Sequence, residues 1–294
     1  MRITDRMTFS QAQTQMMAAR NRALDAQNQV TTGMRVVQPG DDPAAAGLIV
    51  SQNIALQRLD TIDKATSTAT GEVQVADGAL QSVATLLQRA QQLAVQLGND
   101  TYSASERAAG AQEVTGISGQ IAQLMNTQVA GRYIFGGNVD NAPPFDATGA
   151  YTGDTAVRQI EIAPGLLQNA SIRADQTIKG VGGGVDVFAS LSALSSALAA
   201  NDGAGIRNAV ATVSQSNDQV ASALTATGGI LAAFDSAQQI GSVAKDSAQK
   251  VLSAQSEADI FQATSNLALA QQSLQASLAV TAKSFSVSLL DFLK

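Results

Sequence analysis

Few residues of this chain could do chemistry, because its 294 residues include neither histidine nor cysteine. Their absence excludes disulfides, thiol nucleophiles, histidine-assisted serine triads and metal sites built from these two residue types. An enzyme made from this sequence would have to use a serine with a lysine base, or a pair of carboxylates.

Neither arrangement is well placed in the sequence. Lys283 and Ser284 are adjacent, so on a helix their side chains point to different sides. Asp175 and Asp186 flank a glycine-rich return of the chain, where aspartates typically cap a helix or stay solvated. We therefore expect no catalytic site and no cofactor.

A third pair of carboxylates, Asp41 and Asp42, lies directly before Pro43. Two adjacent aspartates could bind a divalent cation. Helix capping is the favoured interpretation, because an N-cap carboxylate accepts free backbone amides and a proline at the first helical position has no amide to leave unpaired. We predict that a helix begins here and that no metal is bound.

The glycine cluster at Gly180, Gly182, Gly183 and Gly184 could cradle a phosphate. It lacks the Lys and the Ser or Thr of a P-loop and does not complete a G-x-G-x-x-G pattern. A flexible hinge at which the chain turns back toward helix is the favoured interpretation.

Two long apolar seams, one at each end of the chain, are the elements that could carry a functional surface. Each seam is a line of apolar residues along one face of a predicted helix. Apolar residues spaced alternately three and four apart fall on one narrow helix face, which is best buried against another helix. The N-terminal seam comprises Phe9, Ala12, Met16, Ala19, Ala23, Ala26, Val30 and Gly33. The C-terminal seam comprises Ile260, Leu267, Leu274, Leu278, Phe285, Leu289, Leu290, Phe292 and Leu293. We predict that both seams are assembly interfaces, and that seams so poor in large side chains are poorly ordered without neighbours.

Between these seams the sequence predicts further helices around a β-rich insert, so the expected fold is mainly α. It is a long antiparallel helical bundle or coiled coil from both halves of the chain, with a small inserted β-rich domain. Helices are predicted at 43–70, 72–97 and 105–129, and β-like runs at 132–135, 157–162, 171–174 and 177–179. The predicted parts are 1–42 (N-terminal assembly helix), 43–130 (first half of a helical rod), 131–184 (insert), 185–256 (second half of the rod) and 257–294 (C-terminal assembly helix).

One polar residue, Asn217, interrupts the seam of the predicted second half of the rod. It could fix the register of the packed helices at some cost in stability, or it could simply face solvent.

Composition limits the partners. A net charge of −6 and a pI near 4.6 argue against nucleic acid, which needs clustered Lys and Arg. No apolar run approaches the length of a membrane span, and Met1 to Ser10 lacks the apolar core of a cleaved signal peptide. We expect a cytoplasmic protein, or one exported by a route that leaves the chain uncut.

Motifs along the chain resemble the flagellin superfamily. The stretch Gln29 to Ala46 (QVTTGMRVVQPGDDPAAA) is similar to the N-terminal signature of that superfamily, with Gly33 and Arg35 in its G-x-R segment and Asp41, Asp42, Pro43 and Ala44 in its D-D-P-A segment. Three further stretches narrow the resemblance to its hook-associated junction members. They are Gly131 to Gly137 (GRYIFGG), Pro144 and Phe145 followed by Tyr151 to Asp154 (YTGD), and Ser288 to Leu293 (SLLDFL).

The resemblance implies a structural protein, exported through the flagellar secretion apparatus and assembled outside the cell. Its terminal helices would pair into a tubular inner layer and its β insert would project outward. The implied partners are neighbouring copies of itself, hook-associated protein 1 on the hook side, flagellin on the filament side, and an export chaperone that holds the C-terminal helix. Two alternatives stay open, a filament-forming flagellin and an unrelated cytoplasmic coiled-coil adaptor.

Overall fold

The computed structural model describes residues 2–146 and 148–292, and helices dominate it. The described residues form seven helices and two small antiparallel sheets, which confirms the predicted mainly α fold with a small β-rich insert. The chain folds into two compact units, Met1–Arg58 with Ala244–Lys294, and Leu59–Val243. The first unit is thus built from both ends of the chain and the second from its middle.

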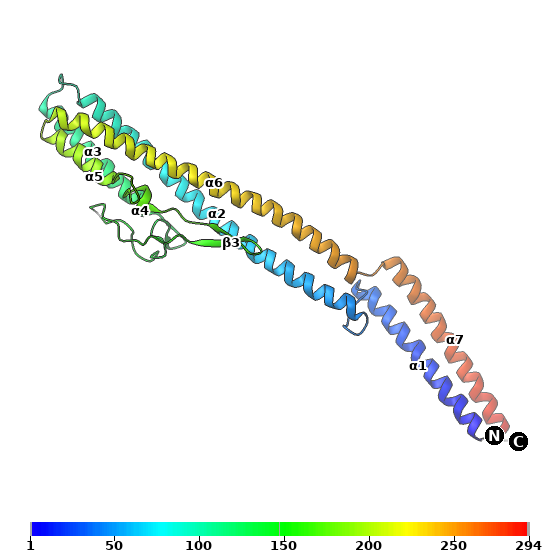
Figure 1. Cartoon of the computed structure of the whole chain (residues 1–294). Helices are drawn as coiled ribbons and strands as arrows, with labels where there is room; N and C mark the ends of the chain where they lie inside the picture. The colour runs from blue at the N-terminus through cyan, green and yellow to red at the C-terminus, as the bar shows by residue number, and fades with distance from the viewer. Residues whose placement is uncertain (1, 147, 293–294) are drawn as a thin grey trace. The chain divides into compact units, whose positions relative to one another are not determined.

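In the first unit the two terminal helices pack against each other. Helix α1 (Arg2–Thr32) and helix α7 (Ile260–Phe292) run antiparallel, so that the start of α1 lies beside the end of α7 (Figure 1). The final helix was predicted to begin at Glu257 but begins at Ile260, because the residues before it pair with the segment that follows α1. The first unit therefore contains a helix pair that is closed at one end by paired connecting segments.

Helices α2 (Pro43–Leu97) and α6 (Gly203–Ser256) contribute residues to both units. The prediction of two helices at 43–70 and 72–97 is wrong, since α2 runs without interruption through Gly71. A glycine inside a helix costs only about 1 kcal/mol relative to alanine, and the buried residues on either side of it, Ala69 and Val73, outweigh that cost.

In the second unit, the ends of α2 and α6 pack with helix α3 (Ala104–Met125) and helix α5 (Val187–Ala199) around one apolar core (Figure 1). The apolar residues of α2 that are spaced alternately three and four apart from Val73 to Leu97 are buried throughout. Residues of all four helices meet in this core, among them Leu80, Leu87, Ile121, Leu194, Leu198, Ile206 and Val213. Most of the protein's large buried side chains therefore lie in this unit.

Helix α3 starts with a capping box, in which Ser103 and Glu106 satisfy each other's backbone amides. It ends at Met125, four residues before the predicted end at Val129, because the following residues enter a β-hairpin. The side chain of Asn126 fixes this exit, since its amide donates to the carbonyl of Phe145 (2.7 Å) and its oxygen accepts from the N–H of Phe145 (3.0 Å).

The insert contains two β-hairpins. Strands β1 (Gln128–Val129) and β2 (Arg132–Tyr133) are joined by Ala130 and Gly131, which both have positive φ, as the tightest hairpin turns require. Strand β3 (Gln159–Ala163) pairs with strand β4 (Leu166–Asn169), which the sequence analysis missed.

Two predicted β-like runs are wrong. The runs at 171–174 and 177–179 flank and overlap the short helix α4 (Ala174–Thr177). Their apolar residues signalled burial correctly, since Ala174 and Ile178 are fully buried. The backbone instead turns tightly, with the N–H of Ile178 donating to the carbonyl of Ala174 (2.8 Å). A short apolar run alone does not distinguish a strand from a buried turn.

A second, smaller apolar cluster lies where β3 packs on α2 and α6. Ile160 and Ile162 share the strand face that packs there against Val73 and Phe234. An ion pair reinforces the contact, because Arg158 binds the largely buried carboxylate of Glu72 on α2. The insert is thereby fixed to the helices of its own unit.

Among the described residues, α6 is the one helix long and apolar enough to cross a membrane by length and composition. Its most apolar window has a mean hydropathy of 1.3, and 17% of that window is buried. The expectation that no apolar run approaches a membrane span is thus too strong for α6. A single helix of this kind is weak evidence for a membrane span.

Candidate assembly surface

The predicted N-terminal seam lies on the side of α1 that packs against α7. Ala19 and Ala26 are buried, while Ala12, Met16, Ala23, Val30 and Gly33 are partly buried. Residues between them along the helix, such as Met17 and Leu24, are exposed. The three–four spacing therefore identified the inner face of α1 correctly. The side chain of Phe9 lies outside the described residues.

The predicted C-terminal seam is only partly on the inner face of α7. Leu267 and Leu274 are partly buried, in line with the buried Ala263. Ile260 and Leu278, however, are 51% and 49% exposed, so they do not belong to the face that meets α1. The reason is spacing, since Leu278 follows Leu274 by four residues, whereas the inner face continues through the partly buried Ser277. The side chains of Phe285, Leu289, Leu290 and Phe292, and all of Leu293, lie outside the described residues.

Large apolar side chains point away from α1 along the described part of α7. Phe261 is 84% exposed, Leu269 62% and Val280 66%. These three residues lie off the single stripe of the predicted seam, although their apolar character away from that stripe is a usable signal in the sequence. A helix that is apolar on more than one side has more surface to bury than one partner covers.

The segment from Gly33 to Ala44, which carries the flagellin-like G-x-R and D-D-P-A motifs, forms the closed end of the terminal helix pair. Gly33 ends α1 with a φ of +68°, a left-handed conformation that glycine adopts without strain. The N–H of Arg35 donates to the carbonyl of Ser256 (2.7 Å), and the N–H of Ala258 donates to the carbonyl of Gly33 (2.8 Å). These two bonds form a short antiparallel bridge between the connection leaving α1 and the one entering α7.

The Arg35 side chain ties the same two connections together. One guanidinium nitrogen, Nη2, donates to the carbonyl of Gln255 (2.8 Å), and the other, Nη1, donates to Oδ2 of Asp42 (2.9 Å). The bond to Gln255 joins residues 220 positions apart in the sequence. The Arg35 side chain thus contacts both the connection between α1 and α2 and the end of α6 that precedes α7.

Asp42 caps α2 as predicted. Its Oδ1 accepts from the N–H of Ala45 (3.0 Å), and Pro43 begins the helix. This backbone bond, followed by the bond from Arg35, lowers the pKa of the Asp42 carboxyl. Asp41 accepts from the N–H groups of Val37 (3.0 Å) and Gln38 (2.8 Å). Capping and turn bonds thus engage both carboxylates, and no cluster of three or more potential metal-ligating side chains occurs among the described residues.

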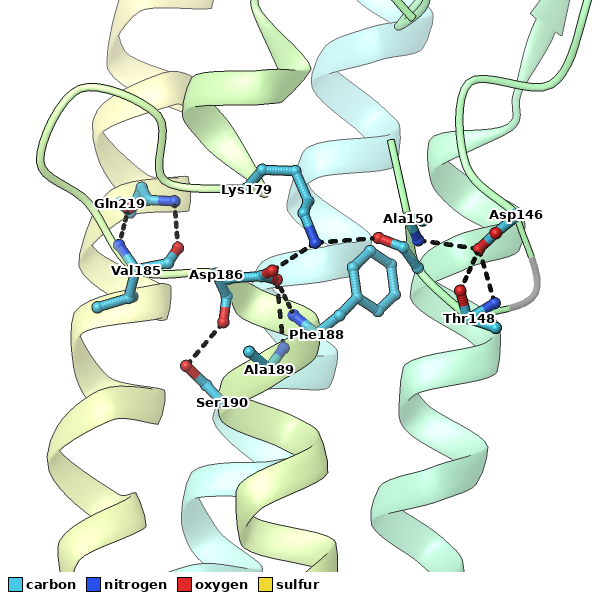
Figure 2. A network of polar contacts seen from close by, with 11 residues as sticks. Asp146, Thr148, Ala150, Lys179, Val185, Asp186, Phe188, Ala189, Ser190 and Gln219 are labelled. Carbon is cyan, nitrogen blue, oxygen red and sulfur yellow. Dashed lines mark hydrogen bonds and ion pairs between the residues drawn. The ribbon is translucent and has the colours of Figure 1, made fainter. Parts of the chain in front are cut away.

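The glycine cluster is a tight turn held by the side chains around it. Gly180, Gly182 and Gly183 have positive φ, and the N–H of Gly184 donates to the carbonyl of Gly180 (2.9 Å). Figure 2 shows Gln219 of α6 pairing with both backbone groups of Val185 directly after the turn, at 2.9 and 3.1 Å. The N–H groups of Gly183 and Gly184 donate to the backbone carbonyl of Gly180, and the P-loop lysine is absent from the sequence pattern. The segment therefore serves as a turn that returns the chain to helix.

The aspartates considered for catalysis have structural partners. Asp186 caps α5 through the N–H groups of Phe188 and Ala189, and it pairs with Lys179, which also donates to the carbonyl of Gly149 (Figure 2). Asp175 is buried and pairs with Arg173 at 2.5 Å, so it is neither solvated nor a cap. The side chains of Lys283 and Ser284 lie outside the described residues.

A small cavity in the second unit lies between α2 and the insert. Its volume is about 20 Å³, and Glu72, Arg132, Tyr133 and Arg158 are among its lining residues. A space of this size holds about one water molecule and no cofactor.

The side-chain oxygen of Asn217 on α6 is buried, with no hydrogen-bond partner among the described residues, so the simple solvent-facing interpretation of this residue is wrong.

Comparison with known proteins places these features in a family context. Residues 3–140 match the bacterial flagellin N-terminal helical region. Flagellar hook-associated protein 3 of Salmonella typhimurium (strain LT2) is 37% identical over 155 residues, which cover 52% of this chain and 49% of that protein. A flagellin of Clostridium tyrobutyricum is 36% identical over 110 residues, covering 36% and 28%. The chain thus spans about half the length, or less, of the curated relatives it matches.

The fold agrees with that of solved relatives. Flagellar hook-associated protein 3 of Legionella pneumophila superposes with a TM-score of 0.63 at 13% identity, covering 69% of this chain and 98% of that one. At this level of identity the match shows the fold alone. Together with the sequence matches, it confirms the resemblance to hook-associated proteins that the motifs predicted.

Proposed function

We propose that this chain, a flagellin-like relative of flagellar hook-associated protein 3, is a structural subunit of the bacterial flagellum at the hook–filament junction. The match of residues 3–140 to the flagellin N-terminal helical region is part of this premise. The observation that carries the proposal is the terminal helix pair. Its inner face is held mainly by alanines, and its outer face exposes large apolar side chains. Such a surface suits a helix pair that is completed by neighbouring subunits.

The composition of α7 supports several simultaneous contacts. Ile260 to Ala282 contains no charged residue. Burying this stretch of the helix on more than one side therefore leaves no isolated charge without a partner, which is the usual obstacle to burying a surface helix. We propose that neighbouring copies of the chain cover the N-terminal seam and the C-terminal seam in the assembled layer, with Ile260 and Leu278 among the residues that face other subunits.

The finer partners follow from the family resemblance. The proposed neighbours are hook-associated protein 1 on the hook side and flagellin on the filament side. The proposed escort is an export chaperone that binds the C-terminal helix before assembly. The protein would reach the flagellum through the flagellar secretion apparatus without a cleaved signal peptide and would act outside the cell. We propose that the protein is not an enzyme.

Deletion of the gene in its own host tests this function. We expect cells that carry hooks without filaments, are non-motile, and shed flagellin into the medium. A plasmid copy of the gene should restore filaments and motility. Deletion cells that keep filaments of normal length would overturn the proposal.

A filament-forming flagellin is the second candidate, because flagellins also match this chain. The two candidates differ in how the purified protein behaves. A flagellin forms long filaments by itself, whereas a junction subunit stays monomeric or stops at a short layer. Electron microscopy of the concentrated protein, with and without flagellar seeds, distinguishes them.

A further inference from the structure

The closed end of the terminal helix pair contains one side chain that reaches across both connections, and we propose that Arg35 is a latch from which the α1–α7 pair orders. Its guanidinium joins the carbonyl of Gln255, at the end of α6, to the carboxylate of Asp42, at the start of α2. Closing the latch holds the end of α1 beside the start of α7.

The helix pair needs such a device because its own packing is thin. The two clusters of buried apolar side chains contain no residue of α1 or α7 among the described residues. Among the side chains of the pair that the structure describes, the buried ones are alanines, namely Ala19, Ala26 and Ala263. A helix pair with so little apolar burial gains little free energy per turn to offset the entropy of ordering its backbone.

A latch at one end reduces that entropy cost. Bringing two distant segments together costs loop-closure entropy, which is lost before any seam contact forms. Once Arg35 and the neighbouring backbone bridge hold the two helices at their base, each further contact is local and adds to a helix that has already nucleated. The pair should therefore be most ordered near Gly33 and progressively less ordered toward the chain ends.

The chemistry of the latch favours arginine. A guanidinium presents nitrogens in a planar fork and binds two acceptors at once, whereas a lysine ammonium is a single point of charge. Asp42 contributes on two sides, since Oδ2 accepts from Arg35 while Oδ1 caps α2 at Ala45. Residues 33–42 thus link the end of α1 to the first turn of α2.

Hydrogen exchange on the full-length isolated chain tests the latch. In the wild type we expect protection in α1 and α7 to be greatest next to the latch, at residues 19–32 and 263–274, and to decline toward the chain ends. Arg35→Ala should accelerate exchange at these positions by about five- to tenfold, the effect of losing one exposed charged pair and one hydrogen bond. Exchange in α3 and α5 should stay unchanged, which also shows that the second unit is folded.

Arg89→Ala is the matched control. Arg89 makes a similarly exposed pair with Glu113 at 2.7 Å, but within the second unit. It should leave exchange in α1 and α7 at the wild-type rate, and Arg35→Lys should lie between Arg35→Ala and the wild type. The proposal is overturned if α1 and α7 show no gradient of protection in the wild type, or if Arg35→Ala leaves it unchanged. Because the readout uses the isolated chain, this result is independent of the proposed role in the flagellum.

Discussion

Single residues with many partners fix the joints of this protein, and buried Arg107 is the clearest case. Its guanidinium donates to the carbonyls of Leu97 (2.9 Å) and Asn99 (3.1 Å) and to the side chain of Asn201 (2.8 Å). It thereby satisfies carbonyl groups at and beyond the end of α2 and, through Asn201, holds the connection after α5. A residue that looks like an ordinary helical arginine in the sequence is a central anchor of the second unit.

Arg107→Ala should lower the free energy of unfolding of the second unit by about 2–4 kcal/mol, because it removes a buried guanidinium and leaves the carbonyl of the buried Leu97 without its side-chain donor. Urea unfolding followed by circular dichroism measures this loss. Arg207→Ala is the control, since Arg207 is exposed and approaches Asp100 at 3.8 Å, while Arg107 approaches the same carboxylate at 3.6 Å. Its effect should stay below about 0.5 kcal/mol. Equal effects of the two substitutions would contradict the anchoring role of Arg107.

The Asp42 carboxyl provides a pH-dependent prediction. Its pKa lies below the ordinary 3.8, first because of the N–H of Ala45 and second because of Arg35. The folded state therefore favours the charged form. The stabilisation from this group is present above the ordinary pKa and is lost as the pH falls through the lowered one.

NMR titration of the Asp42 carboxyl carbon should show this lowered pKa directly. Arg35→Ala should raise the pKa only part of the way to its ordinary value, because the larger contribution, from the Ala45 amide, remains. A complete return to the ordinary value would show that Arg35, and not the helix cap, controls this carboxyl group.

At the scale of elements, α7 combines exposed large apolar side chains with a stretch, Ile260 to Ala282, that contains no charged residue. Leu274 and Leu278 make the distinction testable, since the first is partly buried toward α1 and the second is 49% exposed. The two positions separate the packing of the helix pair from contacts with other subunits.

Leu278→Asp should leave the isolated chain as helical as the wild type while preventing its incorporation into flagella, because the charge falls on a surface that we propose to be buried in the assembly. Motility complementation and immunolabelling of hooks provide the measurement, and Gln272→Asp, which adds the same charge at another exposed position of α7, is the control. Leu274→Asp should instead accelerate hydrogen exchange in α1 as well. Full motility with Leu278→Asp would contradict an interface at this position.

The elements also show how far periodicity can predict structure. The three–four spacing identified the inner face of α1, because a helix face that packs against a partner must repeat with the helical period. The prediction of strands from short apolar runs failed at 171–174 and 177–179, because a buried turn and a strand share the same short apolar pattern. It also missed β4, whose two leucines at 166 and 167 are exposed rather than alternating.

At the scale of the molecule, the two units differ in what stabilises them. The second unit contains both clusters of buried apolar side chains, whereas the first depends on alanine packing, the latch and the backbone bridge. The first unit should therefore be the less stable of the two in an isolated chain.

Limited proteolysis should show this difference. In the isolated chain, a protease of broad specificity should cleave α1 and α7 first and leave a core that contains α3 and α5. In assembled flagella the same helices should be protected, because we propose that neighbouring subunits bury them. Protection across residues 9–30 of the isolated chain as strong as that of α3 would contradict the prediction.

The sequence by itself determined that this is a helical protein with seams at both ends, a capped restart at Asp42 and Pro43, and a flagellin-like motif. These features depend on local periodicity and capping, which the order of residues fixes directly. Only the tertiary structure decided that Arg35 reaches Gln255, that Arg107 anchors the end of α2, and that Leu278 faces away from α1. Such contacts join residues distant along the chain, and packing alone determines which side chains meet.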